Sequence, residues 1–138
     1  MAHKIHLDFV TITQRLKQLK LPEVDQVVGI AKGGVVPASL VAFQLERPLS
    51  LLHISYRDED NAPLHESPVL QSPGLLPLDE GDMPQRILLV DDVCVSGQTL
   101  QLAKQILHQH HIFTLVMKGD ADYQLFPEID TCVHWPWR

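Results

Sequence analysis

The sequence of 138 residues has only two cysteines, no long hydrophobic run and no excess of basic residues. Cys94 and Cys132 form no Cys-x-x-Cys pair, which argues against a secreted disulfide scaffold and against a zinc module. No apolar run approaches the roughly 20 residues that a membrane helix needs, and residues 1–8 lack the apolar core of a signal peptide. We therefore expect a cytoplasmic protein that does not bind a membrane.

The charge of the chain is concentrated in one segment. Residues 56–85 contain seven acidic residues and one basic residue, which accounts for the entire formal net charge of −6. The other charges balance, so the chain lacks the basic stripe typical of a protein that binds nucleic acid. Five of the ten prolines also lie here, which excludes a long helix or a central strand. We interpret this segment as a lid or hood, with a disordered solubilising loop as the alternative.

Composition and periodicity indicate one α/β domain over residues 1–138. With 45% hydrophobic residues, a chain of this length buries roughly 70% of its unfolded surface and forms a core without disulfides. Apolar residues at helical spacing alternate with short apolar runs that are typical of buried strands. The expected strands cover residues 27–31, 49–54, 86–90 and 112–117. This order predicts a mostly parallel central sheet with helices on both faces, which binds ligands at the carboxyl ends of its strands.

Three helices are expected between these strands. Asp8 is positioned to cap the first helix, the second begins near Pro37, and the third covers residues 98–109. Apolar residues recur every three or four positions in each. The residues expected to face the core are Phe9, Ile12, Leu16 and Leu19 in the first helix, Val36, Leu40 and Phe43 in the second, and Leu100, Ala103 and Leu107 in the third.

The most informative motif follows the strand expected over residues 86–90. Two adjacent carboxylates, Asp91 and Asp92, stand at its tip, and the turn from Ser96 to Thr99 opens a helix. The first amide groups of a helix have no partner within it and lie at the positive end of its dipole, so this turn suits a phosphate group. The carboxylates suit sugar hydroxyls or a hydrated magnesium ion. Together the two parts fit a ribose 5-phosphate.

This motif resembles the fingerprint of the type I phosphoribosyltransferases. In that family an apolar strand, two acidic residues and a short apolar stretch precede Thr-Gly-x-Thr, and residues 87–100 match this order with Ser96 in place of the first threonine. A chance acidic strand end is the simpler interpretation, but long motifs in the correct structural context are rarely accidental. A receiver domain also carries an Asp-Asp pair after a strand, but too few residues follow Asp92 for the rest of that domain.

The resemblance implies roles for further residues. Ala31, Lys32, Gly33 and Gly34 correspond to the loop that receives pyrophosphate, where the family has a non-proline cis peptide, here between Ala31 and Lys32. The implied phosphoribosyl site consists of Asp91, Asp92, Val95, Ser96, Gly97, Gln98 and Thr99. In this comparison Asp91 and Asp92 are catalytic and also hold Mg²⁺. Ser55 and Tyr56 correspond to the Ser-Tyr of a mobile catalytic loop.

Within the family, the sequence resembles the bacterial xanthine-guanine and hypoxanthine-type enzymes, which implies a base site near its end. Lys118 occupies the place of a lysine that contacts the 6-oxo group of the purine, with a solvated lysine as the alternative, and Val133 and Trp135 complete the expected base site. Two residues depart from the family pattern. Val95 replaces an aspartate close to the purine N7, and Cys132 replaces the aromatic residue that stacks on the base. Trp135 either takes over this stacking or packs against the core or a dimer partner.

The resemblance predicts transfer of a 5-phosphoribosyl group from 5-phosphoribosyl 1-pyrophosphate to a purine-like nucleobase, with release of pyrophosphate and with Mg²⁺ as cofactor. Such enzymes are usually homodimers or homotetramers. A second hypothesis is a non-catalytic member of the family that senses 5-phosphoribosyl pyrophosphate or a nucleotide, because the base pocket has changed while the phosphate-binding parts remain. A third is that residues 56–85 recruit a protein partner.

Overall fold

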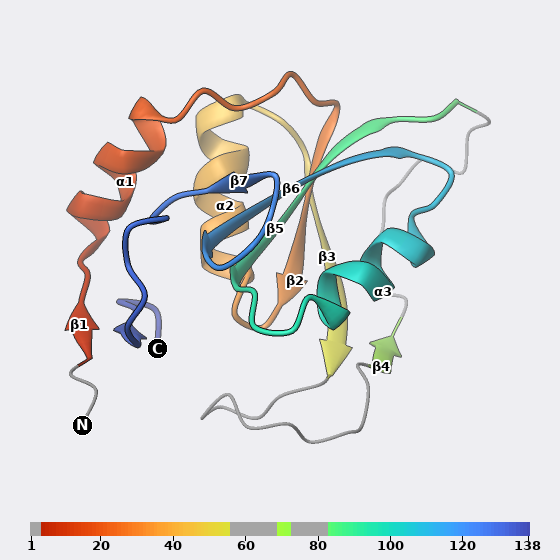
Figure 1. The fold of residues 1–138 in the computed structure, drawn as a ribbon. Helices are drawn as coiled ribbons and strands as arrows, with labels where there is room; N and C mark the ends of the chain where they lie inside the picture. Colours follow the sequence, from red (N-terminus) through yellow and green to blue (C-terminus); the bar gives the residue numbers. More distant parts are fainter. Residues whose placement is uncertain (1–3, 56–68, 73–82) are drawn as a thin grey trace.

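The computed structural model of the chain describes residues 4–55, 69–72 and 83–138. The strands are β1 (Ile5–His6), β2 (Gln26–Ala31), β3 (Leu49–Ser55), β4 (Val69–Ser72), β5 (Arg86–Val93), β6 (His111–Lys118), β7 (Tyr123–Gln124) and β8 (Val133–His134), and the helices are α1 (Phe9–Gln18), α2 (Val35–Leu45) and α3 (Gln98–Ile106). Within these residues, six strands form one sheet in the order β4-β3-β2-β5-β6-β7, while β1 pairs with β8 (Figure 1). In the large sheet only β4 runs antiparallel to its neighbour among the described pairings, so the predicted mostly parallel sheet is confirmed.

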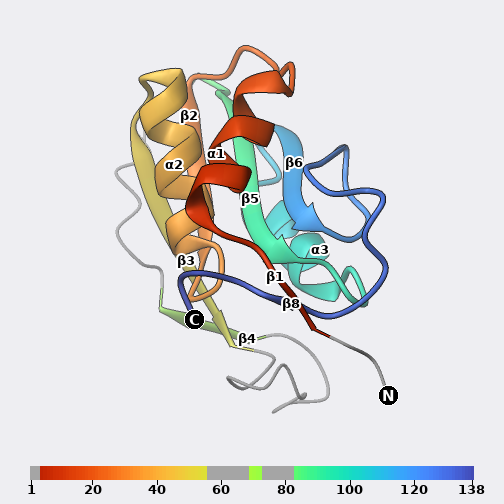
Figure 2. The same cartoon turned by 90° about the vertical axis from the view of Figure 1, so that its left-hand side faces the viewer.

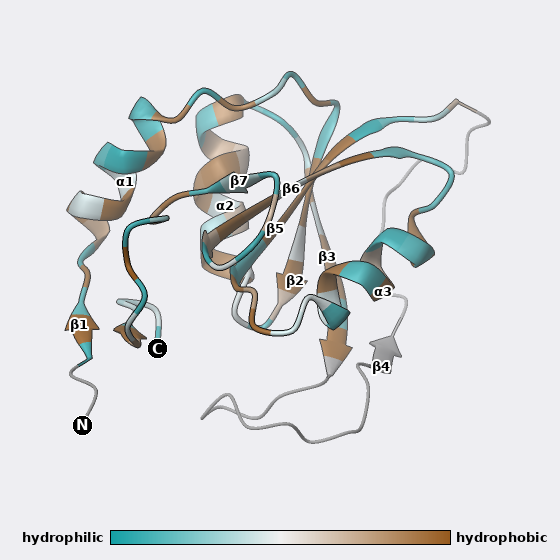
Figure 3. Ribbon diagram, viewed as in Figure 1, coloured by the Kyte–Doolittle hydropathy of each residue, from teal (hydrophilic) through white to brown (hydrophobic). Residues whose placement is uncertain are grey.

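Helices cover both faces of the large sheet. α1 and α2 lie on one face and α3 lies on the other (Figure 1, Figure 2). Alternate side chains of β5 serve the two cores: Leu88 and Val90 pack with α1 and α2, whereas Ile87 and Leu89 pack with α3. All four side chains are fully buried, which explains why the central strands form the hydrophobic middle of the molecule (Figure 3).

The residues predicted to face the core are buried in α3 and partly so in α1. Asp8 caps α1, because its Oδ1 accepts a hydrogen bond from the backbone N–H of Thr11 at 2.8 Å. Ile12 and Leu16 of α1 are buried, whereas Phe9 is 43% exposed. In and directly after α3 the predicted residues Leu100, Ala103 and Leu107 are all buried.

The buried face of α2 differs from the predicted one. Phe43 is 87% exposed, and Val36 and Leu40 are half-buried. The fully buried residues are instead Pro37, Ala38, Val41 and Ala42. The prediction is wrong because α2 is apolar around most of its circumference, so periodicity does not select a face. Close approach selects it: a Cβ on Gly29 of β2 would lie 2.6 Å from the Cβ of Ala38, so only the small-residue face fits against the sheet.

Several element boundaries also differ from the sequence prediction. β5 continues beyond Val90 to Val93, so both aspartates lie within the strand rather than after it. The short strands β1, β7 and β8 carry no clear sequence pattern and were not predicted. Of the expected lid, residues 56–68 and 73–82 lie outside the described residues, and residues 69–72 form β4. Within the described part of the chain, no helix has the length and apolar character needed to cross a membrane.

The segment that follows β7 is held against α1 by contacts of Arg15. Arg15 Nη2 lies 2.7 Å from Glu128 Oε2, and Arg15 Nη1 donates to the carbonyl oxygen of Leu125 at 2.9 Å. The same guanidinium lies 4.6 Å from the centre of the Phe126 ring. The hydrogen bond from Arg15 lowers the pKa of Glu128 to about 2. These contacts position the segment that carries the residues predicted for the base site.

Candidate active site

The carboxyl ends of β2, β5 and β6 bring three loops together at one edge of the sheet. A Cβ placed on Gly33, after β2, would lie 2.4 Å from Oδ2 of Asp92 in β5. A Cβ on Gly119, after β6, would lie 2.4 Å from the carbonyl oxygen of Cys94, and the N–H of Cys94 donates to the carbonyl of Lys118 at 2.9 Å. A side chain at Gly33 would displace the Asp92 carboxylate, and one at Gly119 would displace the backbone at Cys94, so this close approach requires glycine at both positions.

The first loop has the geometry of an anion-binding turn. The peptide bond between Ala31 and Lys32 is cis, as the resemblance implies. The N–H of Gly34 donates to the carbonyl of Ile30 at 2.7 Å, and Gly34 is the N-cap of α2. Lys32 is exposed. The loop therefore places a helix N-terminus beside an exposed lysine, which suits a charged phosphate or pyrophosphate group.

The two aspartates of β5 are both buried. Asp91 is 8% exposed and Asp92 is 5% exposed. Oδ1 of Asp91 accepts a hydrogen bond from the N–H of Asp92 at 2.8 Å, and Oδ1 of Asp92 accepts one from the N–H of Val93 at 2.7 Å. Burial raises the pKa of Asp91 well above its ordinary value, and the negative charge of Asp92 raises it further. Carboxyl groups perturbed in this way cluster at functional sites.

The turn between β5 and α3 follows these carboxylates directly. Gly97 is the N-cap of α3 and has a φ of +82°, in the left-handed region that favours glycine. Ser96 Oγ accepts a hydrogen bond from the N–H of Gln98 at 3.3 Å, and Thr99 is half-buried in the first helical turn. The predicted phosphate-binding residues thus lie at the N-terminus of α3, where backbone amide groups point out of the helix.

The residues predicted for the base lie on three separate elements. Lys118 is the last residue of β6 and Val133 begins β8, and both side chains are half-buried. Val95 is 61% exposed in the turn after β5. Cys132, at the position of the stacking residue, is also exposed. The close contact of Gly119 with Cys94 brings the end of β6 to the turn that carries Val95.

Trp135 lies in the core rather than on an open surface. Its side chain is 2% exposed. Its ring lies 6.4 Å from that of Phe126 and stacks on Trp137, with centroids 5.2 Å apart and an angle of 8° between the rings. Of the two roles that the sequence leaves open, the structure shows packing against the core. The stacking role stays a prediction that requires this segment to move.

One contact of the acidic pair was not predicted. Nη2 of Arg138 lies 2.7 Å from Oδ2 of Asp92. The positive charge of Arg138 also partly offsets the effects that raise the pKa of Asp91. The sequence carries no signal for this ion pair, because the position of Arg138 depends on how the segment after β8 folds.

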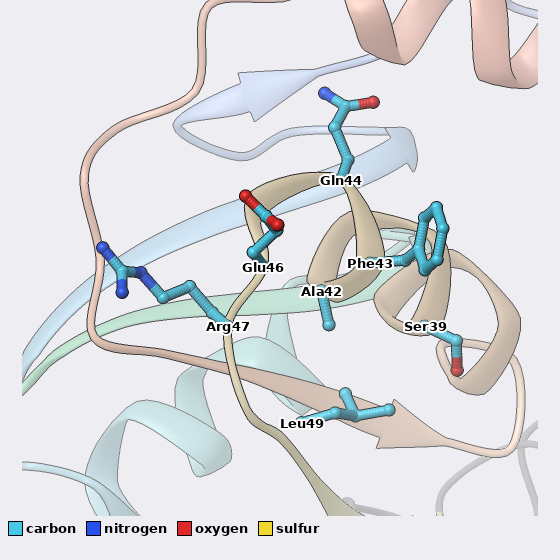
Figure 4. Close-up of a pocket in the computed structure, with 7 residues that line it drawn as sticks. All are labelled: Ser39, Ala42, Phe43, Gln44, Glu46, Arg47 and Leu49. Carbon is cyan, nitrogen blue, oxygen red and sulfur yellow. The ribbon is translucent and has the colours of Figure 1, made fainter.

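The remaining predicted residues, and a hollow on the surface, lie outside the group of loops described above. Ser55 is the last residue of β3, and Tyr56 lies outside the described residues. A surface hollow at the end of α2 and the start of β3 is lined by Ser39, Ala42, Phe43, Gln44, Glu46, Arg47 and Leu49 (Figure 4). It lies at the amino ends of the parallel strands, opposite the acidic pair.

A family model for the phosphoribosyl transferase domain matches residues 11–114. The chain belongs to the phosphoribosyltransferase family. Among curated relatives, xanthine-guanine phosphoribosyltransferase from Cereibacter sphaeroides is 30% identical over 118 residues, which covers 80% of this chain and 67% of the relative. The enzyme of the same name from Ruegeria is 32% identical over 120 residues, with coverage of 80% and 66%. The chain thus spans about two thirds of the length of these relatives.

Solved structures support the phosphoribosyltransferase fold over almost the whole chain. Purine phosphoribosyltransferase from Pyrococcus horikoshii has a TM-score of 0.76 at 21% identity and covers 98% of this chain and 94% of that one. A hypothetical protein from Neisseria gonorrhoeae with bound ppGpp has a TM-score of 0.72 at 23% identity and covers 99% and 90%. The predicted fold, family and class of enzyme are thereby confirmed.

Proposed function

We propose that this phosphoribosyltransferase transfers the 5-phosphoribosyl group of 5-phosphoribosyl 1-pyrophosphate to a purine-like nucleobase. The close contact of Gly33 with the Asp92 carboxylate carries the proposal, because it joins a pyrophosphate loop to a ribose-binding acid in one site. In the reaction the bond from ribose C1 to a pyrophosphate oxygen breaks and a bond from C1 to a ring nitrogen forms. The pyrophosphate leaves with the electrons of the broken bond, and the ring nitrogen loses its proton.

In this proposal each loop holds one part of the donor. The carboxylates of Asp91 and Asp92 accept hydrogen bonds from the ribose hydroxyls, and the amide groups and hydroxyls of residues 96–99 bind the 5-phosphate. Residues 31–34 bind the pyrophosphate. Correct placement of two reactants contributes about 7–11 kcal/mol to lowering a barrier. Positioning is therefore the main catalytic effect that the three loops supply.

The acidic pair also fits a magnesium ion. Mg²⁺ usually binds to one or two carboxylates together with substrate phosphates, rather than to a cage made only of protein groups. Asp91 and Asp92 supply such a pair, and the described residues contain no cluster of three or more histidine, cysteine or acidic groups that would form a cage. When bound, the ion would neutralise charge on the leaving pyrophosphate.

The nature of the base is supported by the curated relatives, which are named for xanthine and guanine. Lys118 at the end of β6 is proposed to donate to an exocyclic oxygen of the base. Val95 cannot accept a proton, and a positioned general acid or base contributes about 10²–10⁴-fold in rate. The proton of the base is therefore transferred to solvent, and catalysis rests on positioning and on stabilising the leaving group.

The test is an assay of pyrophosphate release. The full chain is incubated with 5-phosphoribosyl 1-pyrophosphate, Mg²⁺ and, in separate reactions, xanthine, guanine, hypoxanthine, adenine or orotate. We expect release that depends on a purine base, and loss of release in Asp92→Asn. Release with orotate alone would contradict the purine assignment. No release with any base, while ribose 5-phosphate still binds, would contradict transfer itself.

A second candidate function is favoured by the two departures at the base side, Val95 and Cys132. A non-catalytic phosphoribosyltransferase homologue that senses 5-phosphoribosyl pyrophosphate or a nucleotide would keep the sugar-phosphate loops and lose the residues that act on the base. Calorimetry separates the two functions, because a sensor binds 5-phosphoribosyl 1-pyrophosphate saturably and turns over no base. Asp92→Asn should weaken binding in either case.

A further inference from the structure

Arg138 reaches the acidic pair from a segment that is anchored in the core. The backbone N–H of Arg138 donates to the carbonyl of Trp135 at 3.2 Å, which closes a turn. Trp135 is buried, and Trp137 stacks on it. The segment after β8 ends on the same side of the molecule as the loop between β2 and α2 (Figure 2). This anchoring holds the start of the Arg138 side chain in place.

The guanidinium of Arg138 covers the carboxylate of Asp92. Oδ1 of Asp92 already accepts from the N–H of Val93 at 2.7 Å, and Oδ2 is bound by Arg138 at 2.7 Å. The backbone of Gly33 lies against the same group, since a Cβ there would be 2.4 and 2.6 Å from its two oxygens. The Asp92 side chain is 7% exposed and that of Arg138 is 37% exposed, so Arg138 is the solvent-facing partner of the pair.

The proposed function assigns this same carboxylate to a ribose hydroxyl or to Mg²⁺. We infer that Arg138 sets the affinity of the donor site: it holds Asp92 in the free protein, and the phosphoribosyl group has to displace it. This inference rests on the proposed function. When part of a population holds the binding group in another contact, the apparent affinity falls by the fraction that remains competent. A guanidinium on Asp92 lowers donor affinity in this way.

Two different ligands distinguish the loss of the Arg138–Asp92 contact from a general loss of positive charge. Ribose 5-phosphate carries the hydroxyls that Asp92 is proposed to bind, as well as a phosphate for residues 96–99. Orthophosphate carries only the second group. Removing any positive charge weakens binding of both anions through the field of the protein. Removing the competitor of Asp92 strengthens binding of ribose 5-phosphate alone.

The experiment compares three variants of the full chain by isothermal calorimetry, with ribose 5-phosphate and with orthophosphate as separate probes. Arg138→Ala removes the competing group, and we expect ribose 5-phosphate to bind roughly 2- to 5-fold more tightly, with no gain for orthophosphate. Arg138→Gln removes the charge but keeps a hydrogen-bond donor for the buried Asp92 carboxylate, so this variant is expected to fold. It should show a smaller gain in affinity for ribose 5-phosphate. Arg47→Ala at the opposite end of the sheet is the matched control, and it should not tighten either ligand.

The double variant shows whether Arg138 acts through Asp92. In an Asp92→Asn background, Arg138→Ala should no longer tighten binding of ribose 5-phosphate, because the shared partner is gone. Unchanged or weaker binding of ribose 5-phosphate by both single Arg138 variants would overturn the inference while leaving the proposed function intact. If Asp92→Asn itself binds ribose 5-phosphate as the unmodified chain does, the proposed sugar site is wrong instead.

Discussion

The sugar-phosphate side and the base side of the candidate site are built in different ways. On the sugar-phosphate side, the backbone of Gly33 lies against the side chain of Asp92. On the base side, Gly119 after β6 lies against the backbone of Cys94 in the turn after β5, whereas Val133 of β8 packs against a buried cluster of side chains that includes Trp135. The first side is built at the ends of the paired central strands β2 and β5, and the second also depends on how residues 119–138 pack.

This difference bears on the two positions at which the sequence departs from the pattern that the resemblance implies. A side chain at Gly33 or Gly119 would meet a neighbouring element, whereas a change at an exposed position such as Val95 or Cys132 leaves the framework in place. Exposed positions tolerate substitution within about 0.5 kcal/mol of stability. We therefore expect substitutions at these two exposed positions to leave the fold intact.

The largest expected effect tests whether the base side rests on the core. Trp135→Ala should lower the free energy of unfolding by about 3–5 kcal/mol, because it empties a buried aromatic site. Urea unfolding followed by circular dichroism measures this loss. Phe43→Ala is the matched control, since that ring is 87% exposed and its removal should cost little. Equal losses for the two variants would show that Trp135 supports nothing beneath the base side.

The next largest effect is expected on ligand binding at the sugar-phosphate side. Gly33→Ala places a methyl group where the Asp92 carboxylate lies, so either that side chain or the loop after β2 has to move. Calorimetry with ribose 5-phosphate should give about 100-fold weaker binding, or about 2.7 kcal/mol. Thermal unfolding of the same variant shows whether the fold is retained. Unaltered affinity in a folded variant would mean that this contact does not shape the sugar site.

A smaller effect on the reaction rate is expected when a proton acceptor is introduced on the base side. In Val95→Asp, the rate of pyrophosphate release with hypoxanthine or guanine should rise about 10-fold, below the full effect of a positioned base because the surrounding residues are not adapted to it. Release with adenine serves as the control reaction and should not rise. No increase for any 6-oxopurine would place the base away from residue 95.

The same contrast explains what the sequence predicts well. The pattern of residues 87–100 combines an apolar strand, two acids and a glycine turn, and each part has a local physical cause, so the strand, the turn and the start of α3 follow from it. The cis peptide at Ala31 was expected from resemblance alone and is present. Ends of elements were less certain, because β5 continues through the aspartates by pairing with β6.

Features that depend on tertiary packing escaped prediction. The buried face of α2 is chosen by the small residues Gly29 and Ala38 on facing elements, which periodicity within one helix cannot reveal. The pairing of β1 with β8 joins opposite ends of the chain through two residues each. The contact of Arg138 with Asp92 depends on the turn that begins at Trp135, so no local sequence motif predicts it.

The smallest effect concerns the cost of keeping an acid buried for function. Burial, followed by the charge of Asp92, raises the pKa of Asp91 above the ordinary value of 3.8, so the folded state holds the proton of Asp91 more tightly than the unfolded state. The neutral form therefore favours folding below pH 3.8, and this contribution is lost as the pH rises through the raised pKa. Asp91→Asn stays neutral, and its Oδ1 can still accept from the N–H of Asp92.

At neutral pH, Asp91→Asn should therefore be more stable than the unmodified chain by about 0.5–2 kcal/mol while losing transfer activity, as expected where function imposes strain. Urea unfolding at a series of pH values measures the difference between the two proteins, which cancels the titration of other groups. The difference should shrink as the pH falls and approach zero below pH 3.8, where the Asp91 side chain becomes neutral in the unfolded state as well as in the folded state. A variant that is less stable at neutral pH would instead show that the Asp91 carboxylate is stabilised in place, and the sugar-phosphate side would then carry no stability cost for its function.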